Sequence, residues 1–208
     1  MRSSRLFLLL VATIVSLYAA GANASGVDMR DPRRALGRED DVRVDAQLFQ
    51  DTLASSAPIN VKYQVENLTA AAVAVADRVC DISYDNETQT VTVSIGSEIP
   101  SEGMMPHLVM IGPGQKKVFT AGGVVSVAVP NIRSPFVVVP RYVQIKVNVL
   151  RDIGPFRGLT PNQRMTDQQF DQWIEANDAI FLNAIPVRWK SGGPPTMVDA
   201  ERGSVGSY

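Results

Sequence analysis

The chain has 208 residues, with 20 lysines and arginines against 21 aspartates and glutamates, and a single histidine. This even balance offers no basic surface for the phosphates of nucleic acid and no polybasic segment for an anionic membrane. A lone cysteine, Cys80, excludes a disulfide within the chain, so stability must come from packing, and a domain of this length can bury a sufficient core.

Residues 1–24 have the pattern of a secretory signal peptide. Two arginines precede an apolar run over residues 6–15, and the small residues of Ala22-Asn23-Ala24 follow. The run is shorter than the roughly 20 residues that span a bilayer, and small and polar residues rather than a basic flank come after it. We expect cleavage after Ala24 and a periplasmic or secreted protein with no transmembrane segment after signal removal.

Residues 25–40 are rich in charge and poor in large apolar side chains, which is typical of a flexible arm. Apolar and polar residues then alternate over residues 42–48 and, most regularly, over 59–66, as they do in half-buried strands. Turn residues separate the segments that follow. These further extended segments lie at residues 73–75, 77–84, 90–95, 108–111, 117–120, 124–129 and 143–149.

Seven to nine short strands predict an all-β fold over residues 41–150, an antiparallel β-sandwich. The strand at 59–66 running into Asn67-Leu68-Thr69, and Ile111-Gly112-Pro113-Gly114 before a lysine-rich strand, resemble bacterial immunoglobulin-like domains. The resemblance implies an immunoglobulin-like sandwich. The paired cysteines around a tryptophan that mark antibody domains are absent, because Cys80 is alone and both tryptophans lie downstream.

A short C-terminal α-helix is predicted within a helical appendage of residues 151–190. Thr166 and Gln169 stand at capping-box spacing, so the helix should begin at Asp167. An apolar stripe follows, which we expect to dock on the sandwich rather than on a partner. The stripe consists of Phe170, Trp173, Ile174 and Phe181.

Two further segments complete the chain. Residues 185–189 are expected to add an edge strand. Residues 191–208 are rich in glycine, serine and proline and are expected to form a disordered tail. Cys80 has no neighbouring lysine, histidine or second cysteine to lower its pKa, so we predict that it is buried and unreactive.

Common catalytic and cofactor motifs are missing: HExxH, CxxC, GxSxG, GxxxxGK[ST] and GxGxxG do not occur. One cluster has the composition of a soft-metal site, since Met104, Met105, His107 and Met110 place three thioethers and the only imidazole within seven residues. Thioether sulfur with imidazole suits Cu(I). Methionine is also a common core residue, and alternate residues of a strand point to opposite faces, so a purely structural role stays open.

These observations predict a non-enzymatic exported β-sandwich for protein binding, assembly or envelope structure. Its expected partner is an envelope or secreted protein, and no cofactor is expected. Two alternatives stay open. One is a periplasmic copper-binding protein that uses His107 and the nearby methionines. The other is a hydrolase, in which a pocket would bring His107 beside an acid and a nucleophile.

Overall fold

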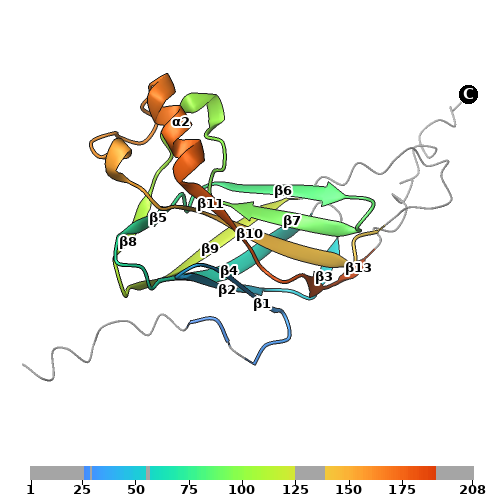
Figure 1. The fold of residues 1–208 in the computed structure, drawn as a ribbon. Helices are drawn as coiled ribbons and strands as arrows, with labels where there is room; N and C mark the ends of the chain where they lie inside the picture. The colour runs from blue at the N-terminus through green and yellow to red at the C-terminus, as the bar shows by residue number, and fades with distance from the viewer. Residues whose placement is uncertain (1–25, 29, 55–56, 125–138, 191–208) are drawn as a thin grey trace, which may run out of the picture.

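The computed structural model describes residues 26–28, 30–54, 57–124 and 139–190. The predicted signal peptide, the predicted tail and most of the strand expected at 124–129 lie outside these ranges. The described residues form two packed β-sheets, a short two-stranded sheet, and one α-helix at one end of the sandwich (Figure 1). The prediction of an all-β fold with a short C-terminal helix is confirmed.

Thirteen strands, two 3₁₀ turns and one helix follow one another along the described residues. The strands are β1 (Arg34–Glu39), β2 (Val42–Leu48), β3 (Thr52–Ala54), β4 (Pro58–Asn67), β5 (Val73–Val75), β6 (Cys80–Asp85), β7 (Thr90–Ile95), β8 (Val109–Ile111), β9 (Lys116–Val124), β10 (Tyr142–Leu150), β11 (Asn177–Phe181), β12 (Ile185–Pro186) and β13 (Arg188–Lys190). The 3₁₀ turns are η1 (Ser101–Gly103) and η2 (Gly154–Phe156), and the helix is α2 (Asp167–Ala176).

One sheet has the strand order β1-β2-β4-β9, and the larger sheet has the order β6-β7-β10-β5-β8 with β11 and β12 also paired to β10. The core lies between the sheets, because apolar and polar side chains alternate along the longest strands. Tyr63 on β4 stacks on Phe119 of β9 within this core, with ring centroids 5.0 Å apart. The fully buried core residues of β2, β4 and β10 are Val42, Val44, Ala46, Leu48, Ile59, Val61, Tyr63, Val65, Val143, Ile145, Val147 and Val149.

The sandwich is not purely antiparallel, which corrects the prediction. Strand β10 runs parallel to β7 over Tyr142–Val147, and the short strand β13 runs parallel to β3. After β7 the chain forms β8 of the same sheet, crosses to the other sheet to form β9, and then returns as β10. A hairpin turn would force antiparallel pairing, whereas a crossover of this length leaves the direction free.

The prediction of a flexible arm over residues 25–40 is wrong for residues 34–39, because these residues form β1. The strand pairs antiparallel with β2 along its whole length, from Arg34 opposite Gln47 to Glu39 opposite Val42. Its only fully buried side chain is Ala35. The backbone ladder with β2 therefore stabilises a segment whose own composition is too polar to predict a strand.

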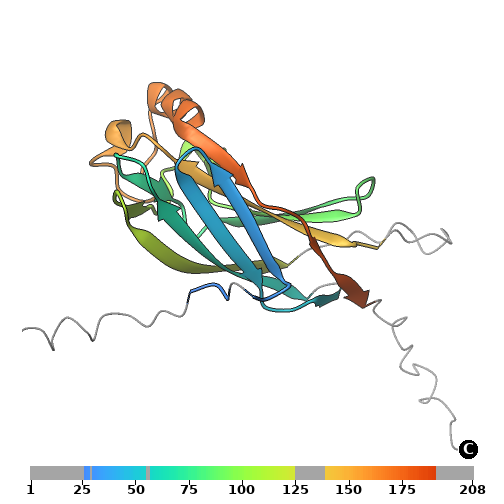
Figure 2. The same cartoon turned by 60° about the horizontal axis from the view of Figure 1, so that its bottom comes forward.

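The expected boundary at residue 150 is also wrong, because the segment that follows contributes strands to the larger sheet. Strand β11 pairs with β10 from Lys146 opposite Phe181 to Leu150 opposite Asn177, and β12 pairs with its other end. Gly37 of β1 lies so close to β11 that an added Cβ would stand 2.8 Å from the carbonyl oxygen of Phe181. Figure 2 shows β1 and β2 beside this C-terminal segment. Residues 177–186 are thus part of the sandwich and not an appendage.

The helix α2 begins at Asp167, as predicted, with Thr166 as its N-cap and a capping box to Gln169. Trp173 is buried against the sandwich, which confirms docking. Ile174 and Phe181 are 49% and 57% exposed, so the predicted stripe is wrong for both. The helix ends at Ala176 and the chain becomes strand β11, so helical periodicity does not reach Phe181. Within the described ranges, no helix has the length and apolar character needed to cross a membrane.

Candidate functional site

A hollow of about 460 Å³ lies at the helix end of the larger sheet. Its walls come from residues 78–81 at the start of β6, from residues 97–107 after β7, and from Pro161 and Asn162 before α2. The side chains with polar or sulfur atoms at this hollow include Arg78, Asp81, Ser97, Met104, Met105 and His107. The hollow therefore gathers most of the metal-site residues predicted from the sequence, although three separate segments build it.

His107 is held by Asp77 at the edge of this hollow. The Nδ1 atom of His107 lies 2.8 Å from Oδ1 of Asp77, and both side chains are partly exposed. We assign Nδ1–H as the donor of this hydrogen bond, because a carboxylate oxygen is an acceptor. This arrangement fixes the ring orientation and leaves Nε2 as the nitrogen that can meet a ligand. Sequence reasoning missed Asp77, because it lies 30 residues upstream with no spacing motif to link the two.

The three methionines predicted for the metal site do not stay together. Met104 and Met105 line the hollow with His107, whereas Met110 lies on β8 and is not part of its lining. Met105 is buried and Met104 and Met110 are exposed to similar extents, 36% and 39%. Strand geometry separates Met110, because it points away from the buried side of β8, where Ile111 lies.

The main chain that carries the two methionines is firmly tied down. The N–H of Met105 donates to the carbonyl of Gln163 at 2.8 Å, and its carbonyl accepts from the N–H of Asn162 at 2.8 Å. Met104 N–H donates to the carbonyl of Ser101 at 2.9 Å. These bonds hold the backbone from which the two thioether side chains extend.

A second, smaller hydrophobic core packs under the part of the hollow that Met105 lines. It contains Met105, Phe156 and Trp173 among its buried residues. The indole Nε1 of Trp173 donates to the carbonyl of Ser97 at 3.0 Å, and the Asn177 side chain donates to the same oxygen at 2.8 Å. The helix α2 therefore holds the loop after β7 in place, and with it one side of the hollow.

A hydrolase would need a nucleophile beside His107. Ser97 and Ser101 both line the hollow. The hydrogen bonds found among the described residues include His107 to Asp77 but none from a serine hydroxyl to His107. The same part of the chain contains no group of three or more histidine, cysteine or carboxylate side chains that could hold a metal ion.

Cys80 lies on β6, half-buried and packed against the main core. Burial, and then the neighbouring carboxylate of Asp81, raise the pKa of its thiol above the ordinary value. The thiol is therefore protonated at neutral pH, which makes it a weak nucleophile and a weak metal ligand.

The outer face of the four-stranded sheet is partly covered by the segment that precedes β1. The side chain of Lys62 donates to the carbonyl of Gly26 at 3.2 Å, and the N–H of Asp28 donates to the side-chain oxygen of Gln47 at 3.3 Å. Val27 is buried there. The outer face is thus partly occupied by the protein's own chain.

Asp45 is buried on this covered face and is the centre of a charged cluster. Its carboxylate accepts from Arg34 at 2.8 Å and from Gln64 at 2.7 Å, and Arg43 lies 3.3 Å away. Burial alone would raise the pKa of Asp45, but the hydrogen bonds from Gln64 and Arg34 and the charge of Arg43 outweigh it and lower the pKa. The charge of Asp45 is therefore balanced by two arginines of its own chain.

One edge of the four-stranded sheet, β1, is closed at its middle by Asn183. The outward N–H of Leu36 on β1 donates to Oδ1 of Asn183 at 2.7 Å, and the N–H of Asn183 donates back to the Leu36 carbonyl at 3.0 Å. At the end of β1, the guanidinium of Arg151 donates at 3.0 Å to the carbonyl of Glu39, whose backbone faces β2. An edge whose backbone groups are bonded in this way is a poor template for another strand.

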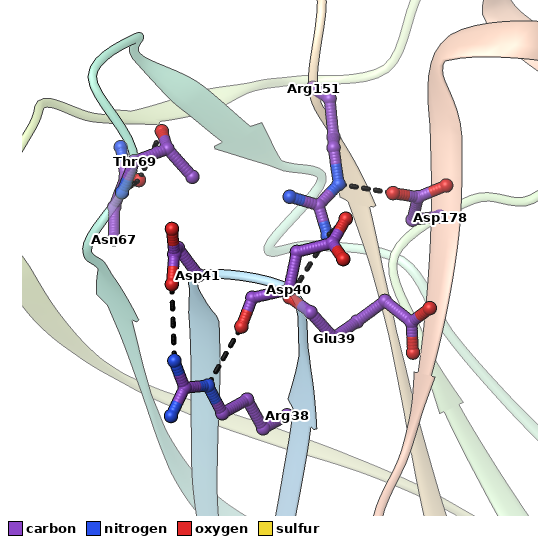
Figure 3. A network of polar contacts seen from close by, with 8 residues as sticks. All are labelled: Arg38, Glu39, Asp40, Asp41, Asn67, Thr69, Arg151 and Asp178. Atoms are coloured by element: carbon purple, nitrogen blue, oxygen red, sulfur yellow. Dashed lines mark hydrogen bonds and ion pairs between the residues drawn. The ribbon is translucent and has the colours of Figure 1, made fainter.

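Figure 3 shows the polar network at the end of this closed edge. Arg151 also pairs with Asp178 of β11 and lies 3.7 Å from Asp40, in the turn after β1. Arg38 donates to the Asp40 carbonyl at 2.7 Å. Asp40 has a positive φ of 46°, a conformation that aspartate tolerates better than most residues. The network fastens the β1–β2 turn to the larger sheet.

The opposite edge, β9, is paired on one side only. Its nine residues pair with β4, and no other strand of the described chain pairs with it. The N–H of Asn67 donates to the Gln115 carbonyl, which fixes the phase of the β4–β9 ladder. Because antiparallel hydrogen bonds alternate, odd-numbered β9 residues bond to β4 and even-numbered ones direct their backbone groups outward. The outward residues are Lys116, Val118, Thr120, Gly122 and Val124.

Comparisons with known proteins assign no family to this arrangement. No family model matches the chain. No curated protein and no solved structure matches it. The function is therefore inferred from the geometry of the hollow and of the two sheet edges.

Proposed function

We propose that this protein is an exported, non-enzymatic module with an immunoglobulin-like β-sandwich, and that it binds an extended segment of an envelope or secreted protein along β9. The pattern of residues 1–24 supports export, and the absence of common catalytic motifs supports a binding role. Two facing sheets and a mostly antiparallel topology support the immunoglobulin-like class, although the parallel β7–β10 pair departs from simple antiparallel pairing.

The difference between the two edges of one sheet carries this proposal. A strand with unpaired backbone groups is a template for strand addition by a partner. On the β1 edge, Asn183 bonds both outward backbone groups of Leu36, whereas β9 extends over nine residues with pairing on one side. The outer face beside them is partly covered by residues 26–28, which leaves the β9 edge as the more accessible surface of this sheet.

A proline substitution tests this edge without breaking the sheet. Thr120 directs its N–H outward, so Thr120→Pro removes a donor that a partner strand would use and keeps the bonds to β4. The full chain, with its own signal and a C-terminal tag, is expressed and crosslinked in intact cells, and bound proteins are identified by mass spectrometry. We expect a reproducible partner for the wild type and about a tenfold loss for Thr120→Pro, the effect of one net backbone hydrogen bond.

The matched control is Arg38→Pro, which removes an outward N–H from the closed β1 edge. We expect it to retain the partner. Val118 also directs its N–H outward, so Val118→Pro provides a second test if Thr120→Pro folds poorly. Circular dichroism reports whether each variant is folded. Equal capture by the wild type and by both folded β9 variants would rule out strand addition at this edge.

A further inference from the structure

We propose that the hollow beside α2 binds a soft metal ion of the Cu(I) type through Nε2 of His107 and the thioethers of Met104 and Met105. This site is distinct from the β9 edge and does not depend on strand addition. Three observations carry it: the composition of the hollow, the orientation of His107, and the firm attachment of the methionine segment.

The donor set favours a soft ion. Thioether sulfur and imidazole nitrogen suit Cu(I), whereas calcium and magnesium require several oxygen ligands. A structural zinc site takes four cysteine or histidine ligands, and the part of the chain that the structure describes has no such cluster. His107, Met104 and Met105 line one hollow, which brings the imidazole and two thioether side chains to the same space.

Asp77 acts as a positioning residue for this site. Histidines that bind metals commonly donate their second ring N–H to a carboxylate, which fixes the tautomer and makes the other nitrogen a better ligand. The 2.8 Å contact between Nδ1 of His107 and Oδ1 of Asp77 has this form. Asp77 would thus hold Nε2 in its metal-binding form without touching the ion.

The site is also accessible and rigid. Met104 is 36% exposed, so an ion can reach it from solvent, while Met105 forms the buried floor. The backbone of Met105 is bonded to Gln163 and Asn162, and its side chain is packed in the small core with Trp173. Because the backbone and Met105 are already held in place, less entropy is lost when an ion binds than at a site formed by a flexible loop.

Cu(I) titration of the purified mature protein tests the proposal. Under anaerobic conditions, the protein competes for Cu(I) with a chromophoric chelator. We expect it to bind one Cu(I) ion per chain. His107→Ala and Met104→Leu should each weaken binding at least about tenfold, the loss expected of a ligand or its support. The matched control is Met110→Leu, which changes an equally exposed methionine outside the hollow and should alter affinity less than about twofold.

The role of Asp77 has its own readout. Asp77→Asn should weaken Cu(I) binding about tenfold in the wild-type background, and its effect should vanish when His107 is alanine, because Asp77 acts through that ring. A structural role alone would lower the melting temperature of the metal-free protein equally in both backgrounds. Met105→Leu, which conserves core volume, separates loss of a ligand from loss of packing.

Several results would overturn the soft-metal site. They are the absence of stoichiometric Cu(I) binding, unchanged affinity in folded His107→Ala, and equal losses in Met104→Leu and Met110→Leu. Zn(II) that binds as tightly as Cu(I) would contradict the assignment to a soft ion. None of these outcomes bears on partner capture by β9, so the two proposals fail independently.

Discussion

Trp173→Ala is expected to lower the free energy of unfolding by about 3–5 kcal/mol, the usual cost of truncating a buried tryptophan. Trp173 is 1% exposed, packs edge to face on Phe156 with centroids 5.4 Å apart, and donates to the Ser97 carbonyl. The substitution removes all three contributions and leaves a cavity between α2 and the larger sheet. Urea denaturation followed by circular dichroism measures the loss.

The control for this prediction is the next residue. Ile174 is 49% exposed, so Ile174→Ala should change stability by no more than about 0.5 kcal/mol. The two substitutions together distinguish docking of α2 on its own sandwich from docking on another molecule. Similar small effects at both positions would mean that the helix does not pack as the structure has it.

Asn67→Ala is expected to cost about 2–4 kcal/mol, because one buried side chain makes four hydrogen bonds and each contributes roughly 1 kcal/mol. Its Nδ2 donates to the carbonyls of Ala71 and Ile111 at 2.8 and 2.9 Å. Its Oδ1 accepts from the N–H and the hydroxyl of Thr69 at 2.9 and 2.7 Å. The side chain thereby joins the end of β4 to the segment before β5 and to β8.

Asn86 is the matched control, since it has the same Asn-x-Thr spacing but is exposed in the turn between β6 and β7. Asn86→Ala should change the free energy of unfolding by no more than about 0.5 kcal/mol. Thermal or urea unfolding of both variants measures the difference. A small effect at Asn67 would show that the buried network is dispensable to the fold.

Local patterns predicted the parts of this fold that local physics decides. The alternation along 59–66 identified β4, and the Thr166–Gln169 spacing located the start of α2 to the residue. Both features depend on residues within one element. The prediction that the apolar helical stripe includes Phe181 is wrong, because the chain changes from helix to strand at Asn177. Pairing with β10, which lies elsewhere in the chain, sets this change.

Features that depend on distant residues were missed. Strand β1 is polar, and what stabilises it is its ladder with β2 and the closure of its edge by Asn183, 147 residues away from Leu36. The contact between His107 and Asp77 likewise joins segments 30 residues apart. Composition pointed to Met104, Met105 and His107, but the separation of Met110 and the role of Asp77 required the three-dimensional arrangement.

Amide hydrogen exchange along β9, resolved by residue with NMR on the mature protein, tests the open edge most directly. We expect fast exchange at Val118, Thr120 and Gly122 and slow exchange at Phe119 and Ala121, because only the odd-numbered amides bond to β4. Leu36, bonded to Asn183, provides a protected reference on the other edge. Uniformly slow exchange from Val118 to Gly122 would contradict the proposal, since it would mean that the outward groups of β9 are already paired.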